Sequence, residues 1–142
     1  MSKIREAQKI LKALGLPGEQ QNEMAALTLL ALAGIGPADP WKNATKKSLT
    51  VTKGIMAFAA ERYQKKYAPN TRETFRRHVL HQFVQCRVAD YNPDNPSLPT
   101  NSPNAHYAIS DAALTVIRAW KTKDWEAECE QYRRQQGSLL EL

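Results

Sequence analysis

Residues 67–85, YAPNTRETFRRHVLHQFVQ, place the strongest constraint on what this chain can fold into. At 100° per residue, Phe75, Val79 and Phe83 fall within one narrow sector of a helical wheel, and Leu80 lies at its edge. An apolar sector of this width is typical of a helix that packs on a core with one face and exposes the other. The segment therefore predicts a helix whose second face is accessible to a partner.

The start of this helix carries its own signal. Asn70 is placed to act as the N-cap, and Glu73 three residues later completes a capping-box pattern in which Asn replaces the usual Ser or Thr. Because Pro69 disfavours helical geometry at Ala68, a preceding helix over residues 51–66 has to stop there. Two helices joined by the short connection APN are predicted to form a helix-turn-helix.

The accessible face of the predicted helix carries groups that can donate hydrogen bonds to base edges or to phosphates. At helical spacing these are Thr74, Arg77, His78, His81 and Gln85. No acidic residue belongs to this stripe of five. A solvated face without a partner is the alternative interpretation of a basic helix, whereas the short turn before this helix favours contact with a nucleic acid.

The charge of the whole chain also favours a polyanionic partner. The formal net charge of the 142 residues is +6, although ribosomal, membrane-surface and other basic proteins share such a balance. Cys86 and Cys129 are the only cysteines and form no CxxC cluster, which favours a reducing cytoplasm over a disulfide scaffold. No segment approaches the length of a transmembrane span, and the start MSKIREAQKILKALG lacks the apolar core of a signal peptide. We expect a cytoplasmic protein without a membrane partner.

Two further helices are predicted before this pair. Residues 3–14 are amphipathic at helical spacing, and Gly15 provides a stop. Pro17 can occupy the first turn of the next helix, whose run NEMAALTLLALAG is apolar on nearly every side before Gly34 and Gly36 end it. A helix of this kind is expected at the buried centre. The loop that follows, IGPADPWKNATKKS, is expected to anchor through Trp41 and to expose Lys42, Lys46 and Lys47.

The period of the apolar residues changes after the helix-turn-helix. RVADY and AHYAIS are strand candidates, and the loop between them, residues 92–104, is rich in Pro and Asn. Two strands around such a loop, directly after a helix-turn-helix, describe a wing. The fold class is therefore predicted as mainly α with a small β-hairpin, a winged helix-turn-helix DNA-binding domain. The wing loop has no Lys or Arg, so either its Asn and Thr side chains reach a groove, with Asn101 as the candidate, or the loop is a rigid turn without a partner.

The remaining sequence predicts two helices. Ser110 or Asp111 caps AALTVIRAW, DWEAECEQYRRQQ follows as an amphipathic helix, and GSLLEL has the composition of a frayed end. We divide the chain into an amino-terminal helix (residues 1–15), the winged helix-turn-helix domain (16–121) and a carboxy-terminal helix and tail (122–142).

The sequence contains no complete catalytic or metal-binding motif. Pro93 and Asp94 form a PD dipeptide, but no acid-x-Lys follows it and its setting predicts a turn. Cys86 is expected on the core side of the wheel and His81 on the other, so the two are not expected to share a metal. The sequence predicts no catalytic residue, no metal ligand and no cofactor in this chain.

Three blocks, QQNEMAALTLLALAGIGPADPW, YAPNTRETFRRHVLHQFV and YNPDNPSLPTNSPNAHYAI, resemble the amino-terminal helix-turn-helix domain of the BsuBI/PstI type II restriction endonucleases. The resemblance runs from about Leu14 to Trp120, and the Pro and Asn spacing of the third block is its most distinctive part. Where the family pattern has a small residue and a glycine after QFV, this chain has Gln85, Cys86 and Arg87.

The resemblance implies double-stranded DNA binding within a restriction-modification defence against foreign DNA. It also implies a separate nuclease domain of the PD-(D/E)xK type, absent from this chain, which would require Mg²⁺ and through which a homodimer would form. A free-standing winged-helix transcriptional regulator is the main alternative, and a domain that binds an acidic protein is the third. The candidate DNA-binding residues are Lys42, Lys46, Lys47, Asn70, Thr71, Arg72, Thr74, Arg77, His78, His81, Gln85 and Asn101.

Overall fold

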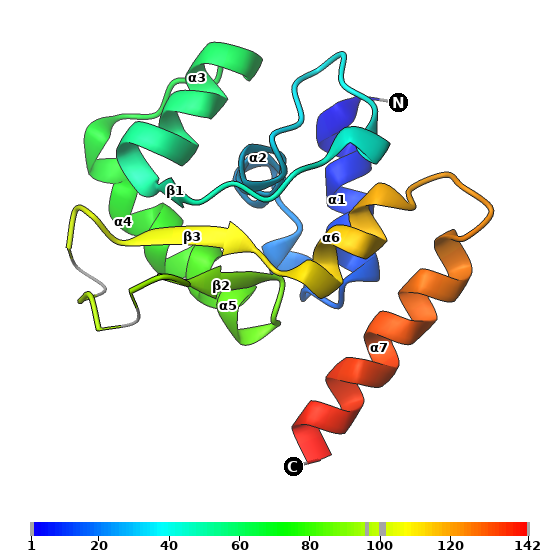
Figure 1. The fold of residues 1–142 in the computed structure, drawn as a ribbon. Helices are drawn as coiled ribbons and strands as arrows, with labels where there is room; N and C mark the ends of the chain where they lie inside the picture. Colours follow the sequence, from blue (N-terminus) through cyan, green and yellow to red (C-terminus); the bar gives the residue numbers. More distant parts are fainter. Residues whose placement is uncertain (1, 96, 100–101, 142) are drawn as a thin grey trace.

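The computed structural model describes the backbone of residues 2–95, 97–99 and 102–141, and the side chains of those up to 136. The helices are α1 (Lys3–Ala13), α2 (Glu23–Ala33), α3 (Ala57–Tyr63), α4 (Arg72–Thr74), α5 (His81–Gln85), α6 (Asp111–Arg118) and α7 (Trp125–Glu141). The strands are β1 (Leu49–Thr50), β2 (Ala89–Tyr91) and β3 (His106–Ile109). The predicted fold class is confirmed, because the chain is mainly helical with one small antiparallel sheet (Figure 1).

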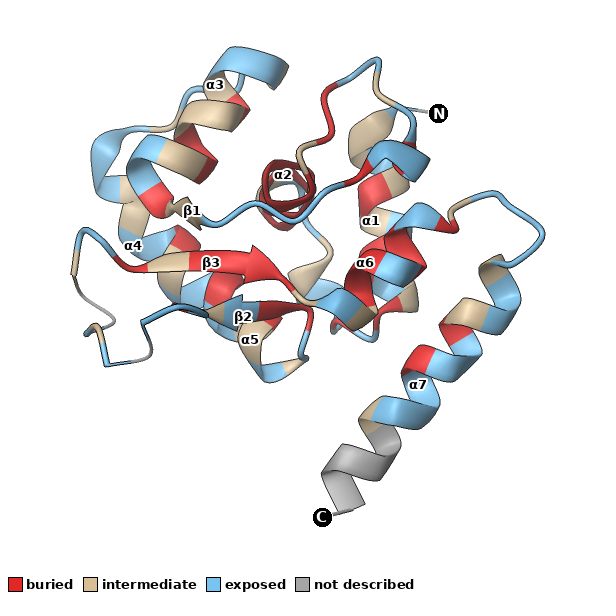
Figure 2. Cartoon of the chain, viewed as in Figure 1, coloured by how far each residue is buried: buried red, intermediate tan, exposed pale blue. Residues whose placement is uncertain are grey.

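Helix α2 forms the centre of the molecule, as its apolar run predicted. Every residue from Ala25 to Ala33 is buried, and Figure 2 shows the helix in red in the middle of the fold. The Asn22 side chain accepts a 2.8 Å hydrogen bond from the Ala25 amide, and Gly34 ends the helix at φ 69°. The predicted start at Pro17 is wrong. Pro17 precedes a short 3₁₀ turn, Gly18–Gln20, and the cap at Asn22 delays the helix to Glu23.

The first helix of the helix-turn-helix is shorter than predicted. A π-helical segment, Val51–Met56, runs directly into α3, so the start at residue 51 is correct. The helix ends at Tyr63 rather than at residue 66, because Gln64 adopts a left-handed conformation with φ 54°. The Tyr63 hydroxyl donates a 2.7 Å hydrogen bond to the Ile35 carbonyl and fixes this end. Pro69 therefore lies beyond the end of the helix and does not cause it.

The second helix is continuous over α4, a π-helical segment (Phe75–Leu80) and α5, and is called the 72–85 helix below. Phe75, Val79, Leu80 and Phe83 are at most 1% exposed, which confirms the predicted core sector. The predicted three-residue connection APN is too short: the two helices are joined by residues 64–68 and a 3₁₀ turn, Pro69–Thr71, because the first helix ends early at Tyr63.

The predicted capping box at the start of this helix is wrong. Asn70 lies inside the 3₁₀ turn, and its side chain makes no capping hydrogen bond. Pro69 has a fixed φ and no amide hydrogen, so it suits the first position of a helical turn and moves the start ahead of Asn70. The Glu73 carboxylate, freed from capping, contacts arginine side chains instead.

The sheet has the strand order β1-β3-β2, and both pairs are antiparallel. Strands β2 and β3 confirm the predicted hairpin, whereas the two-residue strand β1 was not predicted. The turn from the 72–85 helix into β2 passes through Arg87 at φ 60°. The Arg87 and Val88 amides donate to the carbonyl oxygens of Val84 and Phe83 at 3.1 and 2.8 Å, a Schellman cap in which glycine is the usual residue. Arg87 thus occupies a left-handed position, where glycine, the residue of the family pattern, is favoured.

The hairpin loop is anchored by the buried side chain of Asn92. Its Oδ1 accepts a 2.7 Å hydrogen bond from the His106 amide, and its Nδ2 donates a 3.0 Å bond to the Leu98 carbonyl. The Tyr91 hydroxyl donates to the same Leu98 carbonyl at 2.8 Å. These bonds satisfy the buried amide and give the described part of the loop a defined conformation.

The carboxy-terminal helices begin as predicted. Of the two candidate caps for α6, Ser110 is correct, because its Oγ accepts from the Ala113 amide at 3.1 Å. Helix α7 continues to Glu141, so the backbone after Gln136 is helical rather than frayed. The buried Tyr132 hydroxyl of α7 donates a 2.9 Å hydrogen bond to the Cys86 carbonyl. Within the described residues, no helix combines the length and the apolar character needed to cross a membrane.

Candidate nucleic-acid interface

The exposed face of the 72–85 helix has the composition that its sequence predicted. Its core residues point toward α2, so the opposite face is left free of the core. The residues of the predicted stripe, Thr74, Arg77, His78, His81 and Gln85, are all exposed. The face therefore presents hydroxyl, guanidinium, imidazole and amide donors side by side on one rigid element.

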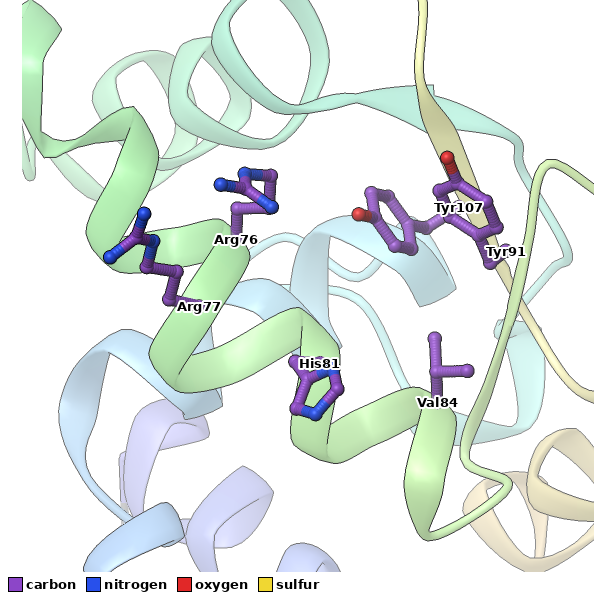
Figure 3. Close-up of a pocket in the computed structure, with 6 residues that line it drawn as sticks. All are labelled: Arg76, Arg77, His81, Val84, Tyr91 and Tyr107. Carbon is purple, nitrogen blue, oxygen red and sulfur yellow. The ribbon is translucent and has the colours of Figure 1, made fainter. Parts of the chain in front are cut away.

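A groove lies beside this face, between the helix and the β2–β3 hairpin. It encloses about 420 Å³ and is lined by Arg76, Arg77, His81, Val84, Tyr91 and Tyr107 (Figure 3). The rings of Tyr91 and Tyr107 lie 5.4 Å apart at an angle of 56°, and Val84 faces them from the helix. The groove thus combines an apolar, aromatic wall on the hairpin with cationic groups on the helix.

Glu73 holds the arginine side chains of this region. Its Oε1 accepts a 3.2 Å hydrogen bond from Nε of Arg76, and its Oε2 accepts a 2.6 Å bond from Nη2 of the same guanidinium. Nε of Arg77 lies 3.4 Å from Oε2. The hydrogen bonds from Arg76 lower the pKa of Glu73, with smaller contributions from the nearby arginine charges. The stripe itself contains no acid, but Glu73, four residues before Arg77, contacts the Arg77 side chain.

The start of the helix is tied to the hairpin loop. Nη2 of Arg72 donates a 3.0 Å hydrogen bond to the Ser102 carbonyl, and its side chain is 28% exposed. Arg72, predicted as a DNA contact, thus has a structural partner in the protein. Asn70 is exposed and Thr71 half-buried in the turn just before it, and their predicted role stays a prediction.

The three predicted lysines lie elsewhere. Lys42, Lys46 and Lys47 are exposed, and Trp41 between the loop and α1 is buried, as expected. Their loop leads into β1, the sheet edge opposite β2, and Nζ of Lys46 is 3.2 Å from Oδ1 of Asp111. The structure therefore does not bring these lysines into the groove. Asn101 lies outside the described residues.

Asp94 of the PD dipeptide lies in a turn, as predicted. Its carboxylate contacts Nε2 of His106, whose Nδ1 is 2.9 Å from the Asn104 carbonyl. Cys86 is half-buried against the core while His81 is exposed, which confirms that the two point to different sides. In the part of the chain that the structure describes, no three His, Cys, Asp or Glu side chains are grouped to hold a metal.

Four residues of the groove were not among the sequence candidates: Arg76, Val84, Tyr91 and Tyr107. On the helical wheel Arg76 falls inside the apolar sector, between Phe83 and Leu80, where burial is expected, and Val84 falls between the two faces, where neither burial nor exposure is predicted. The tyrosines meet only through the hairpin register, in which Tyr91 pairs with Tyr107. A signal was present, because each tyrosine lies in a predicted strand, but their pairing depends on an unusually long loop.

Comparisons with known proteins were consistent with one another. The family described as the BsuBI/PstI restriction endonuclease HTH domain matches residues 1–141. The type II restriction enzyme BsuBI of Bacillus subtilis is 44% identical over 140 residues, covering 99% of this chain and 44% of that protein. The type II restriction enzyme AplI of Arthrospira platensis is 33% identical over 120 residues, covering 84% and 36%.

A solved structure gives the same result in three dimensions. The structure of the SdaI restriction endonuclease matches with a TM-score of 0.87 and 35% sequence identity, over 96% of this chain and 45% of that chain. The chain thus spans less than half the length of each of these relatives.

Proposed function

Because the chain belongs to the family of BsuBI/PstI restriction endonuclease HTH domains, we propose that it binds double-stranded DNA through the 72–85 helix and the adjoining groove. One observation carries the proposal: the exposed stripe of hydrogen-bond donors borders a groove with Arg76, Arg77 and His81 on its helical side. Donors on a rigid helix suit the edges of bases, and cations beside them suit phosphates.

The dimensions of the helix support a major-groove position. Fourteen residues at a rise of 1.5 Å give a length of about 21 Å, and an α-helix fits the major groove of B-DNA. With the helix there, one sugar–phosphate strand passes between the helix and the hairpin. Arg76, paired with Glu73, then lies beside this strand, and the ring of Tyr91, packed on the buried ring of Tyr107, offers apolar surface to a deoxyribose.

The domain would serve a type II restriction endonuclease, in a defence that cuts foreign DNA. The named relatives are restriction enzymes, which favours this assignment over the transcriptional regulator. Cleavage would belong to a nuclease domain outside these 142 residues, and Mg²⁺ and homodimer formation would belong to that domain. A cytoplasmic location follows from a role in cutting DNA that enters the cell.

Fluorescence anisotropy of a labelled duplex across a salt series tests the proposal. If four to six phosphates are neutralised, log K should fall with log salt with a slope of roughly −4 to −5. The double variant Arg76→Ala, Arg77→Ala should flatten this slope by about one unit, because exposed Arg77 is available to a phosphate of random DNA whereas Arg76 is already paired with Glu73. The matched control Lys9→Ala, Lys12→Ala removes two exposed charges from α1, across α2 from α4, and should leave the slope nearly unchanged (Figure 1).

A second measurement separates binding from cutting. Incubated with plasmid and Mg²⁺, the chain should bind without cleaving, because no acid-x-Lys element follows Asp94. Absence of duplex binding at low salt would refute the proposed function. Site-specific cuts that persist after repurification and are lost on Asp94→Ala would refute the assignment of cleavage to another domain.

A further inference from the structure

We propose that Glu73 is a positioning residue that sets how strongly this surface distinguishes its preferred DNA sequence from random DNA; the inference rests on the proposed DNA binding. Glu73 lies in the first turn of the 72–85 helix and is the one acid that contacts arginines of that helix within the described residues. Its carboxylate approaches Arg72, Arg76 and Arg77, at shortest distances of 4.0, 2.6 and 3.4 Å.

Both groove arginines meet this carboxylate through the side of the guanidinium that carries Nε, but Arg76 makes two hydrogen bonds and Arg77 one longer ionic contact. Arg76 uses Nε and Nη2 together, so its side edge is occupied by two hydrogen bonds. Arg77 approaches with Nε, at 3.4 Å from Oε2, while its side chain stays 69% exposed. The terminal edge of Arg77, formed by Nη1 and Nη2, therefore remains free of Glu73.

The terminal edge of Arg77, with Nη1 and Nη2, has the geometry for a bidentate contact to guanine. Two parallel N–H groups of one guanidinium match O6 and N7 of guanine in the major groove. A flexible arginine loses rotamer freedom when it makes such a contact, whereas an arginine already oriented through Nε loses less. Glu73 thus favours the base-specific contact of Arg77 by orienting the side chain before DNA arrives.

The same carboxylate opposes binding that is not specific. Arg76 is compensated by two hydrogen bonds to Glu73, so it is less available to a passing phosphate. Glu73 is itself 48% exposed, and a carboxylate near the DNA backbone repels phosphates. Sequence-independent affinity comes mainly from phosphate neutralisation, so Glu73 lowers this component and leaves the base contact intact.

Glu73→Gln tests the inference against the matched control Glu126→Gln. Both variants remove one negative charge from an exposed side chain, but Glu126 lies on α7 and forms no ion pair among the described residues. The preferred duplex is first selected with the wild-type protein from a randomised pool, and affinities for it and for a scrambled duplex are then measured at several salt concentrations.

Glu73→Gln should raise affinity for the scrambled duplex about threefold to tenfold and steepen its salt slope by about one unit, because Arg76 is released to a phosphate. The ratio of preferred to scrambled affinity should fall at least about fivefold, the lower limit for losing a well-oriented bidentate contact. Glu126→Gln should change both affinities by a similar, small factor. Glu73→Asp, which keeps a carboxylate near Arg76, should restore most of the ratio.

The Nε–H group of Arg76, which donates a hydrogen bond to Glu73, gives an NMR readout that requires no DNA. Its exchange with water should be slowed in the wild type and in Glu126→Gln, and should be fast in Glu73→Gln. An unchanged affinity ratio in Glu73→Gln, or a ratio that falls equally in Glu126→Gln, would overturn the inference while leaving DNA binding intact. A wild type that selects no preferred sequence would also overturn it. A wild type that binds no duplex would instead refute the proposed function.

Discussion

Arg72, the first residue of α4, donates a 3.0 Å hydrogen bond from Nη2 to the carbonyl oxygen of Ser102 in the hairpin loop. The two residues are thirty positions apart in sequence, and the bond joins the start of the 72–85 helix to the wing. Since Asn92 fixes the other side of the same loop, helix and wing are held as one unit. A surface that binds DNA with both elements gains from this rigidity, because less motion is lost on binding.

Arg72→Ala should loosen the wing without unfolding the domain. The loss of a hydrogen bond from a charged donor at a partly exposed site should lower the free energy of unfolding by about 1 kcal/mol. Thermal unfolding followed by circular dichroism gives this value, and faster amide exchange at Asn104 would locate the change in the loop. Arg5→Ala, at an exposed position of α1, is the control, and an equal loss in both variants would show that the link to Ser102 contributes nothing.

Arg77→Ala should weaken binding to the preferred duplex more than binding to a scrambled one. A bidentate contact to guanine is worth about 1–3 kcal/mol of discrimination, whereas a phosphate contact carries no sequence information. Lys47→Ala, in the loop outside the groove, should lower affinity for both duplexes by the same factor. If Arg77→Ala leaves the ratio unchanged while Asn95→Ala in the hairpin loop lowers it, the wing rather than the helix reads the bases.

Arg87→Gly should stabilise the protein. Arg87 holds φ at 60°, which costs a residue with a Cβ more than it costs glycine, and glycine gives back part of this gain through its freer unfolded state. The free energy of unfolding should therefore rise by about 0.5–1 kcal/mol in a chemical denaturation experiment. Gln82→Gly, inside α5, should have the opposite sign, and a loss of stability in both variants would contradict the account of the turn.

The contact between Asp94 and His106 should make the wing sensitive to pH. The Asn104 carbonyl, followed by Asp94, raises the pKa of His106 above its ordinary 6.5, so its stabilising contribution is complete below pH 6.5 and disappears as the pH rises through the raised pKa. The hydrogen bond to His106 lowers the pKa of Asp94 below 3.8, so its contribution is complete above pH 3.8 and is lost as the pH falls through the lowered pKa. The wing should therefore be most stable between pH 3.8 and pH 6.5, where both contributions are complete.

An NMR titration of the His106 ring protons measures this effect directly. Asp94→Asn should lower the pKa of His106 toward its ordinary value, and part of the increase should remain because the Asn104 carbonyl is still present. An identical titration curve in the wild type and in Asp94→Asn would show that the carboxylate does not act on His106 in solution.

Helical periodicity was sufficient to predict which face of the 72–85 helix is buried. The spacing of Phe75, Val79 and Phe83 defines a face from neighbouring turns alone, and burial follows because apolar surface leaves water. The predicted buried face is correct although residues Phe75–Leu80 are π-helical, whereas the helical wheel assumes α-helical spacing. The same local reasoning predicted the stop at Gly34 and limited the cap of α6 to Ser110 or Asp111, since both signals act within one turn of the chain.

Local signals failed where two of them competed. Asn is a preferred N-cap residue, so Asn70 favours a helix start at that position. Pro69 is a preferred first residue of a helical turn, and the structure has the 3₁₀ turn that begins at Pro69. Likewise, the first helix ends where the Tyr63 hydroxyl reaches Ile35 across the fold, before Pro69 has any influence. The choice between such alternatives depends on contacts that the chain makes only after it has folded.

One part of the candidate site could be predicted from local sequence, and the other part depends on tertiary contacts. The stripe from Thr74 to Gln85 belongs to a single helix, so the spacing of the residues was enough to find it. The groove needs Tyr91 and Tyr107, sixteen residues apart, to be opposed across a hairpin, and then to face a helix that precedes both. The Glu73 carboxylate could accept from the backbone amide of Asn70 or from the guanidinium groups of Arg76 and Arg77. In the folded chain it accepts hydrogen bonds from Arg76. Spacing along one helix is a property of covalent geometry, whereas strand register and partner choice arise from packing between distant segments.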